Sequence, residues 1–545
     1  MKFRKIFPAI MAAAVLAISA GAWAEDECAV PVVTESGPVQ GLTHPEGKAC
    51  AWLGVPYAES PVGGLRWTAP KPHSGWNGIR PATAFGNRCL QRSTEGLYPV
   101  WKLTGMGEDC LYLNIYRPRN PGSYPVMVWI HGGGYVMGSG DGYRGDRLAD
   151  AGQVVVVTIN YRLDIFGYLA HPKLRAEDPN QSTGSYGSLD QVAALRWVHD
   201  NIANFGGDPK NVTVFGESAG GWAVCTMLAT PLTHDLFHRA IMQSQGCSAS
   251  VDLEKGYAQS RTVAEKVGCP PDDLACLRAL PALTLVNQGM ASWALEGFTW
   301  FPHHDGYLLT NTPLAMIRQN QYHHVPFMAG HTRDELSAIL FLWPRLYHAR
   351  PSEYGKLLKR NLKLSDPELE KLLALYPLSK YKGSPQEAYR RIFTDLGIGC
   401  QAYIGLAAVA EHQAEVYYYR FDYDEMKYGK YLRALHSMEI PFVFNMLDAK
   451  GWAPLYDRDR LPAAQELSQT MVAYWSNFAR TGDPNRQGLA VWPRFDLNSQ
   501  KFQILDTFVH TETSDQAARC QFWDQYLTTH PDLTQSRAKP DRRWP

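Results

Sequence analysis

The pentapeptide Gly216-Glu217-Ser218-Ala219-Gly220 could turn a serine hydroxyl into a nucleophile. It lies between a strand-like apolar run at residues 211–215 and a helix-like segment at residues 219–229. A turn this tight requires glycine on both sides of the serine, because a side chain there would collide with the neighbouring elements. The strained turn would also lift the hydroxyl clear of the fold. The pattern therefore predicts Ser218 as the candidate nucleophile.

A second glycine-rich segment, His131-Gly132-Gly133-Gly134-Tyr135, precedes this serine and closes an apolar run at residues 125–130. Glycine loops of this kind donate backbone N–H groups to the oxyanion that forms during acyl transfer. The two segments are independent parts of an acyl-transfer site, and they occur in the right chain order. Together they predict a serine esterase.

Such a serine needs a base to take its proton and an acid to hold the base in the correct tautomer. In this arrangement the acid and then the histidine follow the serine along the chain. Glu335 and Asp334 are the candidate acids, since both follow a strand candidate at residues 325–329. His436 is the candidate base, because it follows the strand-like run at residues 415–421. Chain order alone does not single it out, as 12 histidines lie after Ser218.

Apolar runs alternate with helical stretches along most of the chain, which predicts an α/β fold. We expect a large central, mostly parallel sheet with helices on both faces. Residues 340–400 are mostly helical in pattern and are expected to form an insertion over the active site. The strand candidates are residues 30–34, 39–43, 111–116, 125–130, 154–159, 212–215, 240–243, 325–329 and 415–421; the helix candidates include 189–205, 219–229 and 463–479.

Several longer motifs resemble those of the type-B carboxylesterases, the family that includes the cholinesterases and has the α/β-hydrolase fold. Residues 205–221 resemble the family's nucleophile signature, and residues 108–115 resemble its second signature. Further matches occur at residues 54–58, 65–67, 435–442 and 520–523, so that the resemblance extends from about residue 30 to residue 528. The resemblance implies Ser218 as nucleophile, Glu335 as acid and His436 as base. It also implies that three N–H groups form the oxyanion hole: those of Gly133, Gly134 and Ala219.

Ten cysteines are available for disulfides. Their spacing alone suggests a small loop, Cys269–Cys276, and a larger one, Cys89–Cys110. The resemblance implies both of these bridges and a third one, Cys400–Cys520. Cys28–Cys50 is expected as an additional bridge between N-terminal strands. Two residues remain, and either a fifth bridge or two buried free thiols fits the sequence: Cys225 and Cys247.

The substrate pocket is less well defined by the sequence. Trp101 is expected either to bind a cationic group through its ring face, as in cholinesterases, or only to pack over the pocket. Glu217 either adds negative potential beside the nucleophile or holds a structural network. Glu296 and Phe298 stand where cholinesterases have two aromatic side chains, which alters one wall of the acyl pocket. Tyr135 is one of the aromatic side chains expected to line the gorge, with Trp300, Phe341 and Trp343.

The first 24 residues are typical of a cleaved signal peptide, with Lys2, Arg4 and Lys5 before an apolar stretch and an Ala22-Trp23-Ala24 cleavage site. We expect export to the periplasm or the medium, one α/β-hydrolase domain over residues 25–530, and a flexible tail at residues 531–545. The mature chain has 50 basic and 53 acidic residues, so charge gives no reason to expect nucleic acid or an anionic membrane as a partner.

No later segment has the pattern of a membrane span, and a monomer and a homodimer are both compatible with the sequence. The proposed chemistry requires neither a metal nor an organic cofactor, and adjacent His303 and His304 are expected to point to opposite sides of an extended segment. The expected activity is hydrolysis of small to medium carboxylic esters. The alternatives are a choline-ester or bulky aromatic-ester hydrolase and, less favoured, a binding protein that keeps the fold without the chemistry.

Overall fold

The structure is a computed structural model that describes residues 26–46, 48–91, 105–289, 300–337, 340 and 343–530. In this part of the chain, the main sheet has 11 strands in the order β18-β17-β16-β15-β12-β11-β9-β10-β8-β4-β3. The strands from β17 to β10 pair in parallel, and antiparallel strands complete both edges. The strands are β3 (Leu42–Thr43), β4 (Ala49–Pro56), β8 (Tyr112–Pro118), β9 (Tyr124–Ile130), β10 (Val155–Ile159), β11 (Gly207–Glu217), β12 (Arg239–Gln243), β15 (Phe327–Thr332), β16 (Val416–Phe421), β17 (Lys501–Leu505) and β18 (His510–Thr513).

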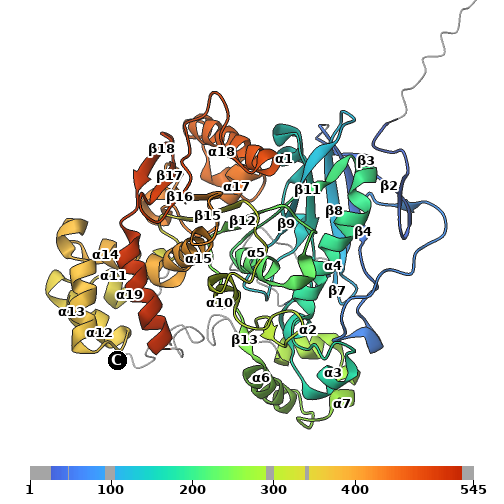
Figure 1. Cartoon of the computed structure of the whole chain (residues 1–545), viewed down its shortest axis with the longest axis horizontal. Coiled ribbons are helices and arrows are strands. Elements are labelled where there is room, and N and C mark those ends of the chain that lie inside the picture. Colours follow the sequence, from blue (N-terminus) through green and yellow to red (C-terminus); the bar gives the residue numbers. More distant parts are fainter. Residues whose placement is uncertain are drawn as a thin grey trace, which may run out of the picture.

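Helices cover both faces of this sheet (Figure 1). The helices are α1 (Gly145–Gly152), α2 (Asp164–Tyr168), α3 (Pro172–Glu177), α4 (Tyr186–Asn201), α5 (Ala219–Ala229), α6 (Leu253–Lys266), α7 (Leu274–Ala279), α8 (Ala282–Thr284), α10 (Pro313–Arg318), α11 (Pro344–Tyr347), α12 (Tyr354–Asn361), α13 (Asp366–Leu375), α14 (Pro385–Thr394), α15 (Cys400–Ala410), α16 (Gly429–Leu432), α17 (Ile440–Val443), α18 (Leu461–Thr481) and α19 (Gln516–Thr529). Short strands form three smaller sheets: β1 (Val32–Thr34), β2 (Gly37–Gln40) and β5 (Arg80–Pro81); β6 (Arg88–Cys89) and β7 (Met106–Gly107); β13 (Val251–Asp252) and β14 (His303–His304).

The hydrophobic core is split into two layers by the sheet, and β9 shows why. Successive side chains of a strand point to opposite faces. Val126 and Val128 therefore pack in the layer that contains α5, whereas Met127 and Trp129 pack in the layer that contains α18. All of these side chains are fully buried. A strand covered by helices on both faces is apolar at every position, which is the pattern that predicted the central sheet.

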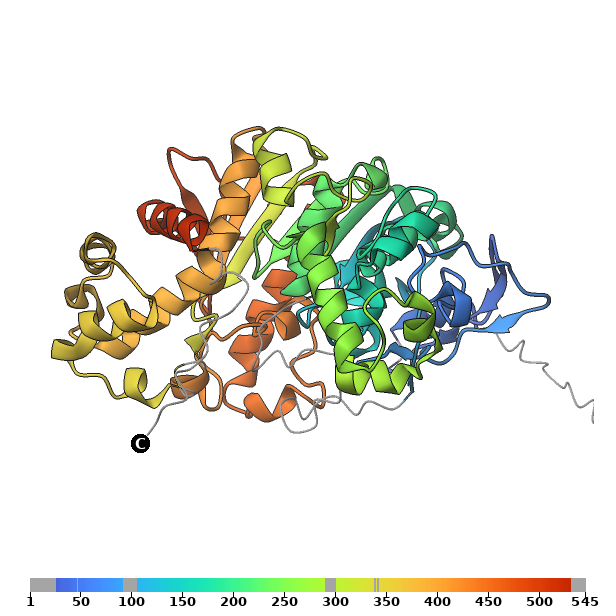
Figure 2. The ribbon, with the colours of Figure 1, turned by 90° about the horizontal axis from the view of Figure 1, so that it is seen from below.

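The expected strands and helices are confirmed, with boundaries that differ by a few residues. Sequence reasoning missed β4, whose residues are all buried, and the edge strands β17 and β18. The described part of the 340–400 segment is mostly helical, as expected. Figures 1 and 2 show α11–α14 at one end of the molecule, with the N-terminal strands at the other end. This helical group meets the loop before His436 through an ion pair between Glu387 and Arg433, at 2.9 Å.

Five disulfides pair all ten cysteines: Cys28–Cys50, Cys89–Cys110, Cys225–Cys247, Cys269–Cys276 and Cys400–Cys520. The pair that the sequence left open, Cys225 and Cys247, forms a bridge between α5 and the loop after β12. It therefore ties the helix that begins beside Ser218 to the neighbouring strand.

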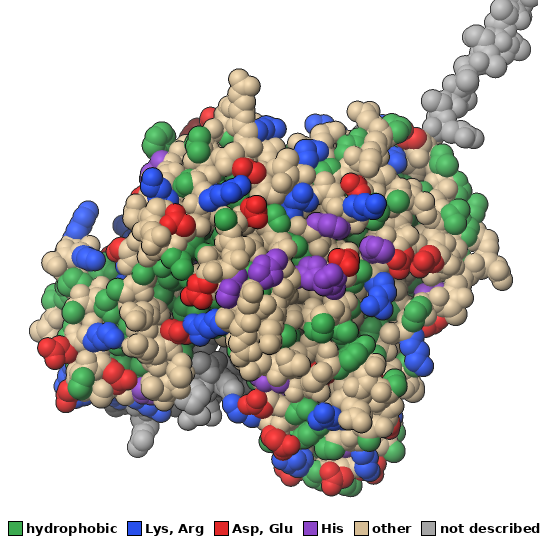
Figure 3. Space-filling model, viewed as in Figure 1, with side chains coloured by type: hydrophobic (Ala, Val, Ile, Leu, Met, Phe, Trp, Pro, Cys, Tyr) green, Lys and Arg blue, Asp and Glu red, His purple; other side chains and the backbone are tan. Residues whose placement is uncertain are grey.

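One helical stretch, Pro385–Ala410, is long and apolar enough to cross a membrane by length and composition, although the sequence did not single it out. In the structure, 78% of its apolar window is buried inside the protein. This is the environment of a core helix. Figure 3 shows basic and acidic side chains interspersed over the face in view, and histidines gathered near its middle.

Candidate active site

Ser218 occupies a sharp turn between β11 and α5. Its backbone has φ 57° and ψ −124°, and its N–H donates to the carbonyl oxygen of Gln243 at 3.0 Å. A Cβ at Gly220 would lie 2.0 Å from the carbonyl oxygen of Ile130, and one at Gly216 would lie 2.6 Å from the carbonyl carbon of Gly220. Only glycine fits at these contacts. The turn therefore has the close contacts at Gly216 and Gly220 that the pentapeptide predicted.

The glycine loop at residues 132–134 lies against this turn. A Cβ at Gly132 would be 3.0 Å from the Cβ of Ser218, so the two segments are in direct proximity. Gly133 and Gly134 have φ of 106° and 65°, which orients successive peptide groups differently from a strand. Ala219 is the first residue of α5, and the first N–H groups of a helix have no partner within it. The glycine loop and the start of α5 therefore both lie beside Ser218.

Glu335 and His436 are joined by a hydrogen bond of 2.5 Å between Oε2 and Nδ1. The Glu335 carboxylate is fully buried and also accepts the N–H of Thr332 at 2.7 Å. Burial alone would raise the pKa of Glu335, but His436 and its hydrogen bond outweigh burial and hold that pKa below its ordinary value. Glu335 is therefore ionised at neutral pH and can fix the tautomer of the imidazole.

Asp334 does not share this position, although it is adjacent in sequence. Its carboxylate pairs with Arg333 at 2.8 Å, and its N–H donates to the carbonyl oxygen of Ala434. Of the two candidate acids, only Glu335 faces the histidine.

The second ring nitrogen of His436, Nε2, faces a different carboxylate. It lies 3.2 Å from Oε1 of Glu217, which also accepts the hydroxyl of Ser437 at 2.7 Å. Within the described residues, no hydrogen bond joins Ser218 Oγ to His436. Catalytic hydrogen bonds of this kind often form only when substrate is bound.

Two carboxylates thus flank one imidazole, and they dominate its electrostatics. Burial alone would lower the pKa of His436, but Glu217 and Glu335 outweigh it and raise that pKa to about 9. Burial in turn raises the pKa of Glu217, and His436 and the Ser437 hydroxyl only partly oppose this effect. The three groups therefore titrate as one coupled unit.

A third buried carboxylate, Glu439, was not singled out by the sequence. It accepts the Ser244 hydroxyl at 3.0 Å, and burial raises its pKa to about 8. Glu439 is consequently neutral at pH 7. The available signal was its position three residues after His436, immediately before α17, which keeps it close to the base.

The structure describes only some of the residues that were predicted to line the substrate pocket. Trp101, Glu296, Phe298 and Phe341 lie outside the described residues. Tyr135 is fully buried and packs on Trp222, with ring centroids 5.8 Å apart, so it forms part of the wall behind the glycine loop. Other aromatic candidates are Trp300, which is buried, and Trp343, which packs against Phe393 at 5.7 Å.

The adjacent histidines separate as expected for an extended segment. Nδ1 of the buried His303 lies 2.7 Å from the carbonyl oxygen of Gly184, whereas the His304 ring contacts the Ser250 hydroxyl at 2.7 Å and Asp252 at 3.2 Å. Their rings serve the packing of β14 against neighbouring loops.

The solved structures that this protein resembles include two esterases. A para-nitrobenzyl (PNB) esterase matches with a TM-score of 0.75 and 33% identity, over 90% of this chain and 99% of the other. A thermophilic PNB esterase matches with a TM-score of 0.76, 33% identity and the same coverage. The large mixed sheet with helices on both faces is accordingly the α/β-hydrolase fold.

The sequence comparisons agree with this assignment. The profile of the carboxylesterase family matches residues 29–523. The para-nitrobenzyl esterase of Bacillus subtilis is 35% identical over 90% of this chain and 97% of its own length. The human cocaine esterase is 32% identical, over 94% and 93% of the two chains. The medium-chain fatty acyl-CoA hydrolase precursor of Anas platyrhynchos is also 32% identical, over 91% and 92%. This chain belongs to the carboxylesterase family and is a serine carboxylesterase.

Proposed function

We propose that this protein is an exported carboxylesterase in which Ser218, His436 and Glu335 form the catalytic triad and small to medium esters are the substrates. The observation that carries the proposal is the 2.5 Å hydrogen bond between His436 Nδ1 and the buried Glu335. That bond turns Nε2 toward the 216–220 turn, because Nε2 faces Glu217, the residue before Ser218. In the proposed mechanism, the hydrogen bond between this imidazole and the serine hydroxyl forms when substrate binds.

The reaction proceeds through an acyl-enzyme. His436 takes the proton of Ser218 while Oγ bonds to the ester carbonyl carbon, and the resulting oxyanion accepts the N–H groups of Gly133, Gly134 and Ala219. The carbon–oxygen bond of the ester breaks, and the alcohol leaves with the proton held by His436. Water then repeats the sequence on the acyl group and releases the acid. These steps require no cofactor.

Bulky aromatic esters are the second candidate substrates. Two relatives carry names that point to such compounds, the para-nitrobenzyl esterase and the cocaine esterase. Glu296 in place of an aromatic side chain would favour the same substrates by opening one wall of the acyl pocket. Choline esters remain the alternative in which Trp101 binds a cation.

The test is hydrolysis of p-nitrophenyl esters from acetyl to dodecanoyl, and of the benzoyl ester, by wild type and Ser218→Ala. Burst-phase acylation should disappear in the folded variant. Maximal kcat/KM on short acyl chains supports a closed acyl pocket, and a maximum on benzoyl or long chains supports the second candidate. Near wild-type turnover by Ser218→Ala contradicts the assignment of the nucleophile. Absence of turnover by folded wild type on every ester would favour a binding protein.

Export is supported by the five disulfides, which form and persist in oxidising compartments. The proposed cleavage after Ala24 gives a mature chain that begins at Glu25. N-terminal sequencing of the protein recovered from periplasm and medium tests this directly. Recovery of an intact Met1 from the membrane fraction would contradict it.

A further inference from the structure

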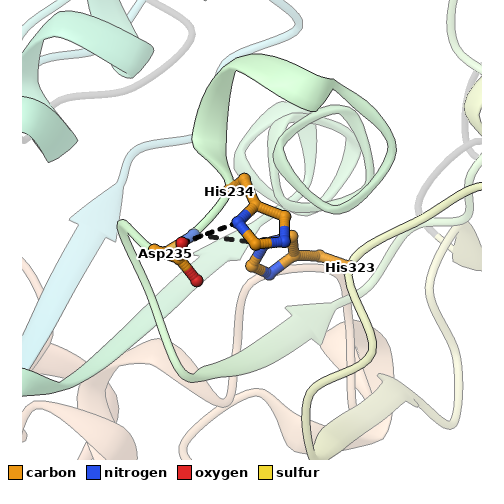
Figure 4. A group of neighbouring side chains, drawn as sticks. All are labelled: His234, Asp235 and His323. Atoms are coloured by element: carbon orange, nitrogen blue, oxygen red, sulfur yellow. Dashed lines mark hydrogen bonds and ion pairs between the residues drawn. The ribbon is translucent and has the colours of Figure 1, made fainter.

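A group of metal-ligand side chains lies at the end of the sheet opposite the candidate active site. His234 and Asp235 are in the turn between η4 (Pro231–Thr233) and β12, and His323 is in the segment between α10 and β15. One ligand atom of each residue lies within 4.8 Å of the others, and Figure 4 shows the three side chains converging. Both segments lead into the starts of parallel strands, whereas Ser218 and Glu335 follow the ends of parallel strands.

The contacts within this group orient it for ligation. Nδ1 of His234 lies 2.7 Å from Oδ2 of Asp235, and the rings of His234 and His323 meet edge to face with centroids 4.6 Å apart. A carboxylate that holds one ring nitrogen of a histidine leaves the other nitrogen free for a metal, as in many metal sites. The second oxygen of Asp235 is then also available as a ligand.

His323 supplies a third, better anchored ligand. Its backbone N–H donates to the carbonyl oxygen of Leu228 in α5 at 2.8 Å, and its Nε2 accepts the N–H of Asp235 at 3.2 Å. Its Nδ1 is buried and has no hydrogen-bond partner among the residues that the structure describes. Burial therefore removes Nδ1 from water without a replacement hydrogen bond. The lone pair of Nε2 accepts only the backbone N–H of Asp235, which belongs to the exposed turn.

The turn can close onto an ion. Tetrahedral zinc with bonds of about 2.0–2.1 Å to nitrogen needs ligand atoms about 3.3 Å apart. The side chains of His234 and Asp235 are 71% and 83% exposed, so they can rotate inward with little loss of packing. In closing, the metal takes the lone pair of His323 that now accepts the Asp235 N–H.

Further histidines lie next to the same group. A hollow of about 530 Å³ is lined by the three residues together with Phe237, His238, Tyr322, His324, Val325 and Pro326. This hollow has room for water or a fourth imidazole to complete the coordination. Imidazole with a single carboxylate suits zinc, copper and nickel, whereas calcium and magnesium prefer sets made of oxygen atoms.

We propose that His234, Asp235 and His323 bind one zinc ion that fastens the segment before β12 to the segment before β15. The ion would stabilise the fold rather than take part in ester hydrolysis. The five residues of β12 span about 13 Å, four steps of ~3.3 Å, between this end of the sheet and the end at which Ser218 follows the neighbouring β11. The proposal is independent of the triad assignment.

The test uses untagged, chelator-treated protein titrated with zinc in a calorimeter, with thermal unfolding measured in parallel. We expect one saturable zinc site per chain and a Tm that rises with zinc, because an ion that binds only the folded state stabilises it. His323→Ala should weaken binding by about tenfold or more, as losses around metal sites do. Calcium and magnesium should leave Tm unchanged. kcat on p-nitrophenyl acetate should be the same with and without zinc.

Two further variants test whether zinc binding depends on this group of residues. His234→Gln changes a side chain that is 71% exposed, so it should lose zinc binding while it keeps its zinc-free Tm. His510→Ala is the matched control, because His510 also pairs with an exposed carboxylate, Glu512, at 3.3 Å on a distant strand. Wild-type affinity in His234→Gln, equal losses in His510→Ala, or no zinc binding by wild type would each overturn the proposal.

Discussion

Replacement of Glu217 by glutamine should move the acid limb of the pH–rate profile, because Glu217 faces the base directly. In the proposed triad, His436 must be neutral to take the serine proton, so kcat/KM should fall as pH drops through the pKa of the coupled group. The carboxylate of Glu217 lies 3.2 Å from Nε2 and favours the protonated imidazole. Glu217→Gln keeps the shape of the side chain and removes its charge. The pKa of His436 should therefore fall.

The size of this shift follows from the distance. At 3.2 Å, two unit charges in a medium of effective dielectric ~20 interact by about 5 kcal/mol. That is a ceiling, since burial raises the pKa of Glu217 and so disfavours its charged form. One charge at this range typically shifts a pKa by about 1–3 units. We expect the acid limb to move down by that amount, with a lower plateau because the imidazolium of the transition state loses a partner.

The assay is kcat/KM for p-nitrophenyl acetate from pH 5 to about pH 10.5, which extends past the pKa of about 9 of His436. Spontaneous hydrolysis is subtracted, and product is followed at its isosbestic wavelength. The two profiles should cross, with the variant faster than wild type at low pH and slower on the plateau. Asp334→Asn is the control, because the Asp334 carboxylate pairs with Arg333 at 2.8 Å and does not face His436. A Glu217→Gln profile that is lower at every pH with an unchanged midpoint would refute the reasoning. Equal shifts in both variants would refute it as well.

Three other perturbations test separate contacts. Glu335→Gln should lower kcat/KM by about 10³–10⁴-fold, as loss of a triad carboxylate does elsewhere, and Asp334→Asn far less; the reverse order in steady-state kinetics would move the acid by one residue. Replacing Cys225 and Cys247 together by serine should reduce the free energy of unfolding in urea by about 3 kcal/mol, from a 22-residue separation, and an unchanged value would deny the bridge. The pKa of Glu439 is raised from 4.5 to about 8, so the folded state holds a proton that the unfolded state has released, and stability from this group falls as pH rises through that window. The Tm of Glu439→Gln relative to wild type should accordingly rise from pH 5 to pH 8, whereas a difference independent of pH would show that Glu439 does not titrate there.

The sequence could predict those structural features that are determined by residues close together in the chain. The apolar run that became β9 and the turn at Ser218 each follow from neighbouring residues, through burial on both faces of a sheet and through the space that only glycine leaves. The choice of Glu335 over Asp334 needed the family resemblance, since both follow the same strand. The pairing of Cys225 with Cys247 depends on how α5 packs against the loop after β12. No local pattern contains that information.

The contact between Glu217 and His436 could not be predicted from local patterns either, because the two residues are more than two hundred positions apart in the sequence. Three serines near this contact also have strained backbones, which sequence patterns do not reveal. Ser218, Ser244 and Ser437 all have positive φ, at 57°, 53° and 71°. Glycine would relieve each strain, which typically costs about 1–3 kcal/mol per residue. Glycine would also remove the hydroxyl of the candidate nucleophile Ser218, the hydroxyl that Ser244 donates to Glu439 and the hydroxyl that Ser437 donates to Glu217. Each of these three positions therefore combines an unfavourable backbone conformation with a hydroxyl that a buried carboxylate or the proposed reaction requires.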